Sequence, residues 1–178
     1  MYCSMQPYAQ KLGLDVPLVS YNGALVKGAL SGKVYVNSPL KLQTALDLLQ
    51  YVKENGHYVQ VYMGDKLYVK EENEYSRMYA KISGIQAVAI GEEIYSIKEA
   101  PNKLLLMTAT ENFDATWKDV EEKFKGRVDV TSSKDNYLEL MEPGVNKWQA
   151  VKSLAESFGI KPEEIMCIGD SNNDLSMI

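Results

Sequence analysis

Residues 38–70 and 110–142 follow the same plan, and this repeat constrains the possible folds more than any other feature of the chain. Each segment begins with an amphipathic stretch that ends at a glycine, Gly56 or Gly126, and continues with two β-prone runs around a short polar turn. The order helix, strand, turn, strand is therefore expected twice. Two such units predict a duplicated α+β layer with its helices on one face of an antiparallel sheet.

Local signals refine this plan. Ser38 is expected to cap the first helix of the repeat, with Pro39 in its first turn. Hairpin turns are expected at residues 64–65 and near residues 133–135, where glycine or short polar side chains interrupt the β-prone runs. Between the two units, residues 71–83 predict a further helix.

The two ends of the chain differ from the middle. Residues 143–178 predict a helix followed by the apolar run "IMCIG" at 165–169, and a strand that is apolar at every position is typical of a parallel sheet covered on both faces. Residues 1–37 predict a helix end, a strand, a turn and a hairpin. The simplest interpretation is an α/β domain, formed by residues 1–37 and 143–178, interrupted by an inserted α+β domain at 38–142.

Composition excludes several classes of function. The formal net charge of −5 argues against a nucleic-acid partner, and no apolar run has the roughly 18 residues that a membrane span needs. The two cysteines, Cys3 and Cys167, predict no disulfide framework and fit a reducing, cytoplasmic location; Cys167 is expected to be a small buried hydrophobe. The single histidine, His57, excludes a histidine-based zinc site and leaves no other histidine for a Ser-His-Asp site.

The last ten residues, "GDSNNDLSMI", allow two interpretations. Ser171 and Asp174 match a capping box at the start of a helix. Asp170 has no place in that pattern; it follows the predicted strand directly, where α/β proteins bind ligands, and a carboxylate is a ligand that Mg²⁺ prefers. Gly169 before it would let a ligand approach the backbone closely. From these residues alone, a helix cap and a metal site both remain open.

The same ten residues resemble the fourth motif, Gly-Asp-x-x-Asn-Asp, of haloacid-dehalogenase-type (HAD) phosphatases, and most of all the Cof-like type IIB sugar-phosphatase branch. Residues 144–178 resemble that branch almost position by position, and "YNGALV" resembles the turn that precedes its cap domain. The resemblance covers nearly the whole chain. It implies a HAD-like Rossmannoid core, incomplete here, with an inserted α+β cap, and it places Asn22 and Gly23 at the mouth of the active site, although these two residues could be only a turn.

The resemblance also implies roles for four residues. Asp170 is a Mg²⁺ ligand, and Asp174 supports the metal site through a bound water or by orienting its neighbours. Asn173 binds near the substrate phosphate. Lys147 neutralises the charge of phosphate and nucleophile. The alternative for Lys147 is a solvated lysine at a helix N-terminus, where its charge is unfavourable.

The family chemistry needs an aspartate nucleophile in an Asp-x-Asp-x-Thr motif, which this chain lacks. The chain is therefore expected to be a piece of a longer protein, truncated at both ends and inactive alone. The resemblance implies that the parent is a Mg²⁺-dependent phosphatase of small phosphorylated metabolites such as sugar phosphates, acting through an aspartyl-phosphate. Two alternatives stay open: a non-catalytic binding or regulatory module that retains the cap, and a phosphotransferase or phosphomutase of the same fold.

Substrate selection is implied to lie in the cap, around the hairpins at residues 63–65 and 133–135. Tyr58, Tyr62 and Tyr68 alternate along the strands predicted there. They are expected to pack on the sheet rather than to stack on a sugar. The partner is a small phosphorylated metabolite, and neither a nucleic acid nor a membrane is expected.

Overall fold

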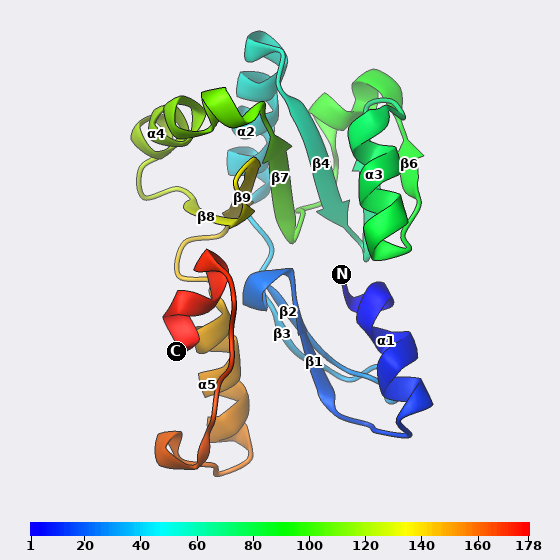
Figure 1. Ribbon diagram of the computed structural model, residues 1–178, viewed down its shortest axis with the longest axis vertical. Helices are drawn as coiled ribbons and strands as arrows, with labels where there is room; N and C mark the ends of the chain where they lie inside the picture. Colours follow the sequence, from blue (N-terminus) through cyan, green and yellow to red (C-terminus); the bar gives the residue numbers. More distant parts are fainter.

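The computed structural model describes residues 1–178 and contains two separate sheets (Figure 1). The smaller sheet is antiparallel in the order β1-β2-β3, and helix α1 packs against β1. The turn predicted at Asn22 and Gly23 is confirmed, because a single 3₁₀ turn, η1, joins the first two strands. The elements of this part are α1 (Tyr2–Lys11), β1 (Pro17–Ser20), η1 (Tyr21–Gly23), β2 (Leu25–Gly28) and β3 (Val34–Asn37).

The larger sheet has six strands in the order β6-β5-β4-β7-β9-β8, all antiparallel to their neighbours except the parallel pair β5 and β6. Its strands are β4 (Tyr58–Met63), β5 (Lys66–Val69), β6 (Ala87–Ala89), β7 (Lys103–Met107), β8 (Asp129–Lys134) and β9 (Tyr137–Met141). Its helical elements are α2 (Leu42–Asn55), α3 (Glu74–Ser83), η2 (Gly91–Ser96), η3 (Thr110–Asn112) and α4 (Phe113–Lys123).

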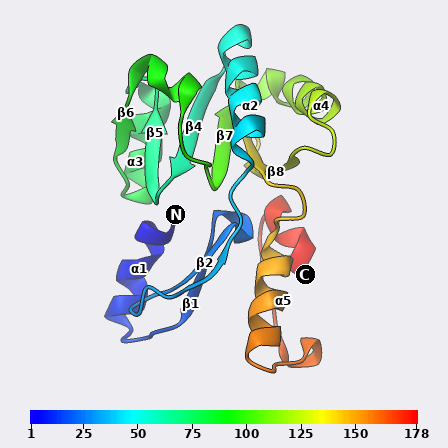
Figure 2. The ribbon, with the colours of Figure 1, turned by 180° about the vertical axis from the view of Figure 1, so that it is seen from behind.

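The repeat that the sequence predicts is confirmed, since α2-β4-β5 and α4-β8-β9 have the same order. The main hydrophobic core lies between the sheet and these two helices, with Leu48, Leu104 and Val120 fully buried in it. Helix α3 lies on the opposite face, where Tyr75 and Tyr79 pack into a second apolar cluster (Figures 1 and 2). The expectation that the helices of the two repeated units share one face of the sheet is thus confirmed, and α3, which lies outside those units, covers the other face.

Two predictions about helix starts are wrong. Ser38 does not cap α2, which begins at Leu42 with Lys41 in the N-cap position. The helix expected after Ser171 is a 3₁₀ segment, η5 (Asn172–Met177), rather than an α-helix. The helix predicted before it is present as α5 (Lys147–Ser157), followed by the short 3₁₀ turn η4 (Pro162–Glu164).

The strand expected at residues 165–169 does not form, and no parallel sheet joins the two ends of the chain. Met166 and Ile168 are instead 85% and 80% exposed. A strand needs a neighbour to pair its backbone N–H and C=O groups, and no other strand of residues 1–178 lies beside this segment. Cys167 is consequently half-buried rather than buried, and both cysteines are free, as expected.

The placement of α5 and η5 brings distant parts of the chain together. Helix α5 packs against η1 and β1, and η5 lies against β8 of the larger sheet (Figure 1). Residues near 22, 147 and 173 therefore meet under the edge of the six-stranded sheet. The domain bounds 1–37, 38–142 and 143–178 stay a prediction. None of the helices combines the length and the apolar character that crossing a membrane requires.

Candidate functional site

Lys147 is the first residue of α5 and is held by two residues of η5. The side chain of Asn146 caps the helix by accepting a hydrogen bond from the backbone N–H of Gln149 at 2.9 Å. The Lys147 ammonium group forms an ion pair with Asp174 and donates a hydrogen bond to Oδ1 of Asn173 at 3.2 Å. A cation is unfavourable at a helix N-terminus, so the carboxylate of Asp174 offsets a cost built into this position.

Asp174 is buried, and both of its carboxylate oxygens are engaged. Oδ1 faces Lys147, while Oδ2 accepts hydrogen bonds from the backbone N–H groups of Asp170 at 3.1 Å and Ser171 at 3.2 Å. The hydrogen bond from Lys147 and then the backbone hydrogen bonds hold the pKa of Asp174 below its ordinary value. The expected capping contact from Asp174 to the Ser171 N–H is therefore present.

Gly169 is required by this packing. A Cβ atom at position 169 would lie 2.3 Å from Cβ of Asp174, so the glycine lets the loop backbone close over that side chain. Of the two roles implied for Asp174, these contacts favour orienting its neighbours. The sequence suggested that Gly169 lets a ligand approach the backbone closely. In the structure, the group that approaches the backbone of Gly169 is the side chain of Asp174.

Asp170 has an exposed side chain beside this arrangement. Its Oδ1 atom accepts a hydrogen bond from the Ser171 hydroxyl at 3.2 Å. Within residues 1–178, nowhere do three or more His, Cys, Asp or Glu side chains gather closely enough to hold a metal ion. Asp170 is thus a single available carboxylate, and its role as a Mg²⁺ ligand stays a prediction.

The turn η1 lies next to Asn173 and has an unusual backbone conformation. Tyr21, Asn22 and Gly23 have φ angles of 52°, 54° and 105°, so three consecutive residues lie at positive φ. For non-glycine residues such angles cost about 1–2 kcal/mol each, and they persist only where surrounding contacts enforce them. Asn22 accepts a hydrogen bond from Nδ2 of Asn173 at 3.3 Å, and Gly23 packs directly against the backbone carbonyl of Asn146.

The six-stranded sheet contributes two charged residues that the sequence patterns did not single out. Nδ2 of Asn22 donates to Oε2 of Glu139 on β9, and Oε1 of Glu139 accepts from the Ser133 hydroxyl at 2.7 Å and pairs with Nζ of Lys103 at 3.3 Å. Burial alone raises the pKa of Glu139, but Lys103 and the hydrogen bonds from Ser133 and Asn22 outweigh burial and leave it lowered. The available signal was a single charge in each of two otherwise apolar strands, "KLLLM" and "YLELM".

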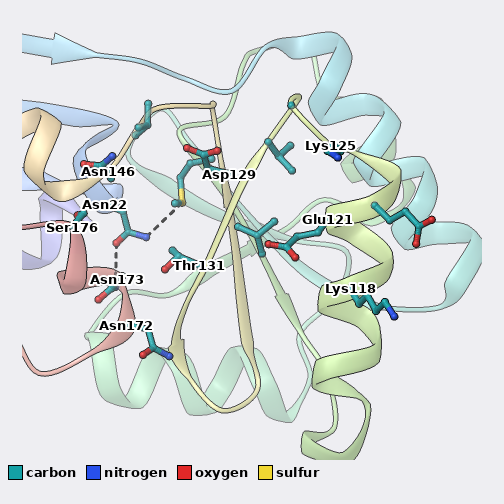
Figure 3. Close-up of a pocket in the computed structure, with 16 residues that line it drawn as sticks. Asn22, Lys118, Glu121, Lys125, Asp129, Thr131, Asn146, Asn172, Asn173 and Ser176 are labelled. Atoms are coloured by element: carbon teal, nitrogen blue, oxygen red, sulfur yellow. Dashed lines mark hydrogen bonds between the residues drawn. The ribbon is translucent and has the colours of Figure 1, made fainter.

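Two cavities adjoin these residues, and Asn22 lines both. The larger, about 640 Å³, lies between the η5 segment that carries Asn173 and the end of α4, with Lys118 and Glu121 on the helix and Lys125 just after it (Figure 3). Lys147 lines only the smaller of the two, about 380 Å³. The full lining of the smaller cavity is Met1, Met5, Val19, Ser20, Tyr21, Asn22, Tyr62, Tyr79, Lys103, Lys147, Val151 and Met177.

We take the smaller cavity as the candidate site, because it is lined by Lys147, whose ammonium group is held by Asp174 and Asn173. Of the residues that the sequence singled out, the structure brings Lys147, Asn173, Asp174 and Asn22 together through hydrogen bonds. Gly23 supports this group through the backbone of α5.

Comparison with known proteins gives a consistent result. The haloacid dehalogenase-like hydrolase family matches residues 1–178. Among curated proteins of Bacillus subtilis, phosphatase YwpJ is 24% identical over 95% of this chain and 68% of its own length, and 5-amino-6-(5-phospho-D-ribitylamino)uracil phosphatase YwtE is 25% identical over 92% and 65%.

Among solved structures, TM0651 from Thermotoga maritima superposes with a TM-score of 0.84 at 30% identity, covering 99% of this chain and 66% of that protein. The chain therefore spans about two thirds of the length of each of these relatives. The match to the family extends over all 178 residues, as the terminal motif led us to expect. The chain belongs to the haloacid dehalogenase-like hydrolase family.

Proposed function

We propose that the protein containing this chain is a Mg²⁺-dependent phosphomonoesterase that acts on small phosphorylated metabolites such as sugar phosphates. The observation that carries the proposal is the placement of Lys147, whose ammonium group is fixed by Asp174 and Asn173 at the wall of a cavity. The names of YwpJ and YwtE, both phosphatases, support it.

Different residues of the site would contribute charge, positioning and hydrogen bonds to the binding of a phosphate. Lys147 supplies a positive charge to the phosphate oxygens, and Asp174 keeps that charge in place without leaving the cation uncompensated when the site is empty of substrate. Asn173 and Asn22 are linked to each other at 3.3 Å, and their amides offer further hydrogen bonds near the phosphate. This arrangement favours an anion that enters beside the N-terminus of α5.

The donor chemistry of Asp170 fits Mg²⁺, which commonly binds proteins through one or two carboxylates and completes its shell with water and substrate phosphate. Bound there, the ion would offset the negative charge of the phosphoryl group. The aspartyl-phosphate route that the resemblance implies also needs a nucleophile. Residues 1–178 contain no Asp-x-Asp-x-Thr, and the proposal assigns the nucleophile to none of them. We place the activity in the cytoplasm, in keeping with the free thiols of Cys3 and Cys167.

Release of inorganic phosphate by the full-length protein, across a panel of phosphorylated metabolites with and without Mg²⁺, tests the proposal. Lys147→Met should lower kcat/KM by about 100-fold or more, the usual effect of removing one preorganised charged donor. Lys152→Met is the matched control, because Lys152 lies on the same helix in an exposed ion pair with Glu156. Absence of Mg²⁺-dependent phosphate release, or equal effects of the two substitutions, would contradict it. Transfer of the phosphate to a second metabolite would favour the phosphotransferase alternative.

A further inference from the structure

A chain of hydrogen-bonded side chains joins Glu139, on strand β9 of the six-stranded sheet, to Lys147 at the start of α5. Nδ2 of Asn22 donates to Oε2 of Glu139, and Oδ1 of Asn22 accepts from Nδ2 of Asn173 at 3.3 Å. Oδ1 of Asn173 in turn accepts from Nζ of Lys147 at 3.2 Å. The chain runs from the sheet through the turn η1 and the segment η5 to the helix, so it connects elements that are far apart in the sequence.

The two ends of this chain determine the orientation of both amides between them. A carboxylate only accepts hydrogen bonds, so Asn22 has to present its NH₂ group to Glu139 and its carbonyl to Asn173. That carbonyl also only accepts, so Asn173 has to present its own NH₂ group to it and its carbonyl to Lys147. The ammonium group of Lys147 only donates, and it meets the acceptor that this orientation provides. Reversing either amide would place two donors or two acceptors face to face.

Glu139 is held in the acceptor-only form that this orientation needs. Its side chain is 5% exposed, and its Oε1 atom accepts from the Ser133 hydroxyl at 2.7 Å and pairs with Nζ of Lys103 at 3.3 Å. Burial raises the pKa of Glu139, but Lys103 and the hydrogen bonds to the carboxylate outweigh burial and leave the pKa lowered. The carboxylate is therefore ionised at neutral pH, with Oε1 committed to the sheet and Oε2 to Asn22.

The same orientation leaves the ammonium group of Lys147 with one donor for a ligand. An ammonium group has three N–H donors, and those of Lys147 meet Oδ1 of Asp174 and Oδ1 of Asn173. The lysine side chain is flexible, so a single contact with Asp174 would let the ammonium group turn. Two contacts hold it in one place at the wall of the 380 Å³ cavity that Lys147 lines, with its third donor still available.

We propose that Glu139 is a positioning residue: through the amides of Asn22 and Asn173, it fixes the ammonium group of Lys147 in the orientation that receives a phosphate. The phosphate at Lys147 rests on the proposed function, whereas the hydrogen-bonded chain does not depend on it. A donor that is already in place binds a charged group more tightly than one that must first be ordered. Glu139 acts only through other residues, and the proposal requires no contact between its carboxylate and a substrate.

Replacement of Glu139 by glutamine should reverse the chain while keeping the shape of the side chain. The buried ammonium group of Lys103 needs an acceptor, so the glutamine carbonyl should face Lys103 and the glutamine NH₂ group should face Asn22. Both amides of the chain would then have to turn over. Asn173 would present its NH₂ group to Lys147, and the ammonium group would lose one of its two contacts.

Nitrogen-15 NMR of the lysine ammonium groups, recorded on the full-length protein without phosphate, measures this effect, and Lys147→Met assigns the signal. In Glu139→Gln the ammonium protons of Lys147 should exchange with water about 10-fold faster, the equivalent of one hydrogen bond from a charged group. Isothermal titration calorimetry with inorganic phosphate and Mg²⁺ should show affinity weakened by a similar factor. Glu142→Gln is the matched control, because Glu142 lies just beyond β9 in an ion pair with the exposed Lys41, and it should change neither quantity.

A double-mutant cycle tests whether Glu139 acts through Asn173. In an Asn173→Ala protein the chain is already broken, so adding Glu139→Gln should change the exchange rate and the phosphate affinity less than about twofold. A merely structural role of Glu139 predicts the same factor in both backgrounds. Equal factors in the two backgrounds, or no larger effect of Glu139→Gln than of Glu142→Gln, would overturn the inference. A Lys147 ammonium group too mobile to give a signal in the unsubstituted protein would overturn it as well.

Thermal unfolding followed by circular dichroism checks that the variants fold, because Glu139→Gln leaves Lys103 buried without a counter-charge. If that variant does not fold, Lys103→Met/Glu139→Gln and Lys103→Met/Glu139→Leu replace it. Neither contains a buried unpaired cation, and only the glutamine offers Asn22 an acceptor. Exchange at Lys147 should then be several-fold slower in the glutamine protein, and equal rates would overturn the inference.

Failure of this inference is distinguishable from failure of the proposed function, because the exchange rates are measured without substrate. Coupling between Glu139 and Lys147 in a full-length protein that releases no phosphate from any ester would refute only the phosphatase activity. Mg²⁺-dependent release of phosphate without that coupling would refute only the positioning role.

Discussion

Replacement of Gly23 by alanine tests how closely the turn η1 and the N-terminus of α5 are packed. At this position φ is +105°, and an added Cβ atom would lie 2.4 Å from the carbonyl oxygen of Asn146 and 3.1 Å from Cβ of Ala150. Those neighbours are backbone and a short side chain, so neither can move aside by changing rotamer. We expect the turn and the first turn of α5 to be pushed apart.

The magnitude follows from two contributions. Positive φ at a residue with a Cβ costs about 1–2 kcal/mol, and forcing an extra methyl group into a packed interior costs about 1–3 kcal/mol. Together they predict a loss of about 2–5 kcal/mol in the free energy of unfolding. Because Lys147 follows Asn146 directly, the same displacement should also lower the affinity of the site for phosphate.

Urea denaturation followed by circular dichroism measures the first effect, with Gly56→Ala as the matched control. Gly56 has a φ of +67° and no atom within 4 Å of the added Cβ, so its substitution carries only the conformational cost of about 1–2 kcal/mol. The difference between the two variants isolates the steric contribution. A loss at Gly23 no larger than the loss at Gly56 would refute the proposed packing of η1 on α5.

Three more predictions concern the charges of the site. The pKa of Asp174 is lowered in the folded protein, so its contribution to stability is present above the unfolded pKa and is lost as the pH falls through the folded pKa. The deficit of Asp174→Asn in the free energy of unfolding should therefore shrink as the pH is lowered below the ordinary pKa of an aspartate, about 4, in urea titrations. Asp170→Ala should change the free energy of unfolding by less than about 0.5 kcal/mol, because the side chain is exposed, yet abolish the Mg²⁺-dependent release of phosphate. Tyr21→Phe removes the 2.6 Å hydrogen bond to Asp65 and should cost about 1 kcal/mol of unfolding free energy, against no change for the exposed Tyr8→Phe. Retention of the Asp174→Asn deficit at low pH, a large loss at Asp170, or equal effects at Tyr21 and Tyr8 would contradict these assignments in turn.

Local sequence patterns predicted the elements that are stabilised mainly by their own periodicity and by their immediate neighbours. Helix α2 and the hairpin of β4 and β5 follow from leucines at helical spacing, a terminal glycine and a two-residue turn. The same reasoning found α4 and its hairpin, and hence the repeat. It failed at residues 165–169, because an apolar run becomes a strand only where another strand lies beside it.

The residues of the candidate site also differ in whether a local sequence pattern could predict them. The terminal motif singled out Asp170, Asn173 and Asp174 through their spacing, and the helix N-terminus singled out Lys147, because both signals are local in sequence. Glu139, thirty residues before that motif, was not predicted, since one acidic residue in a strand does not indicate its partner.

The sequence by itself thus determined the family, the repeated α+β unit and the residues of the terminal motif, because each is written in contiguous stretches of the chain. Only the tertiary structure decided that Asp174 holds Lys147 and the loop around it, and that Asn22 links Asn173 to Glu139. It alone placed Lys103 at the same cavity as Lys147. These relations join residues far apart in the chain, and they depend on how a strained turn, a helix end and a sheet face pack together, which no local pattern encodes.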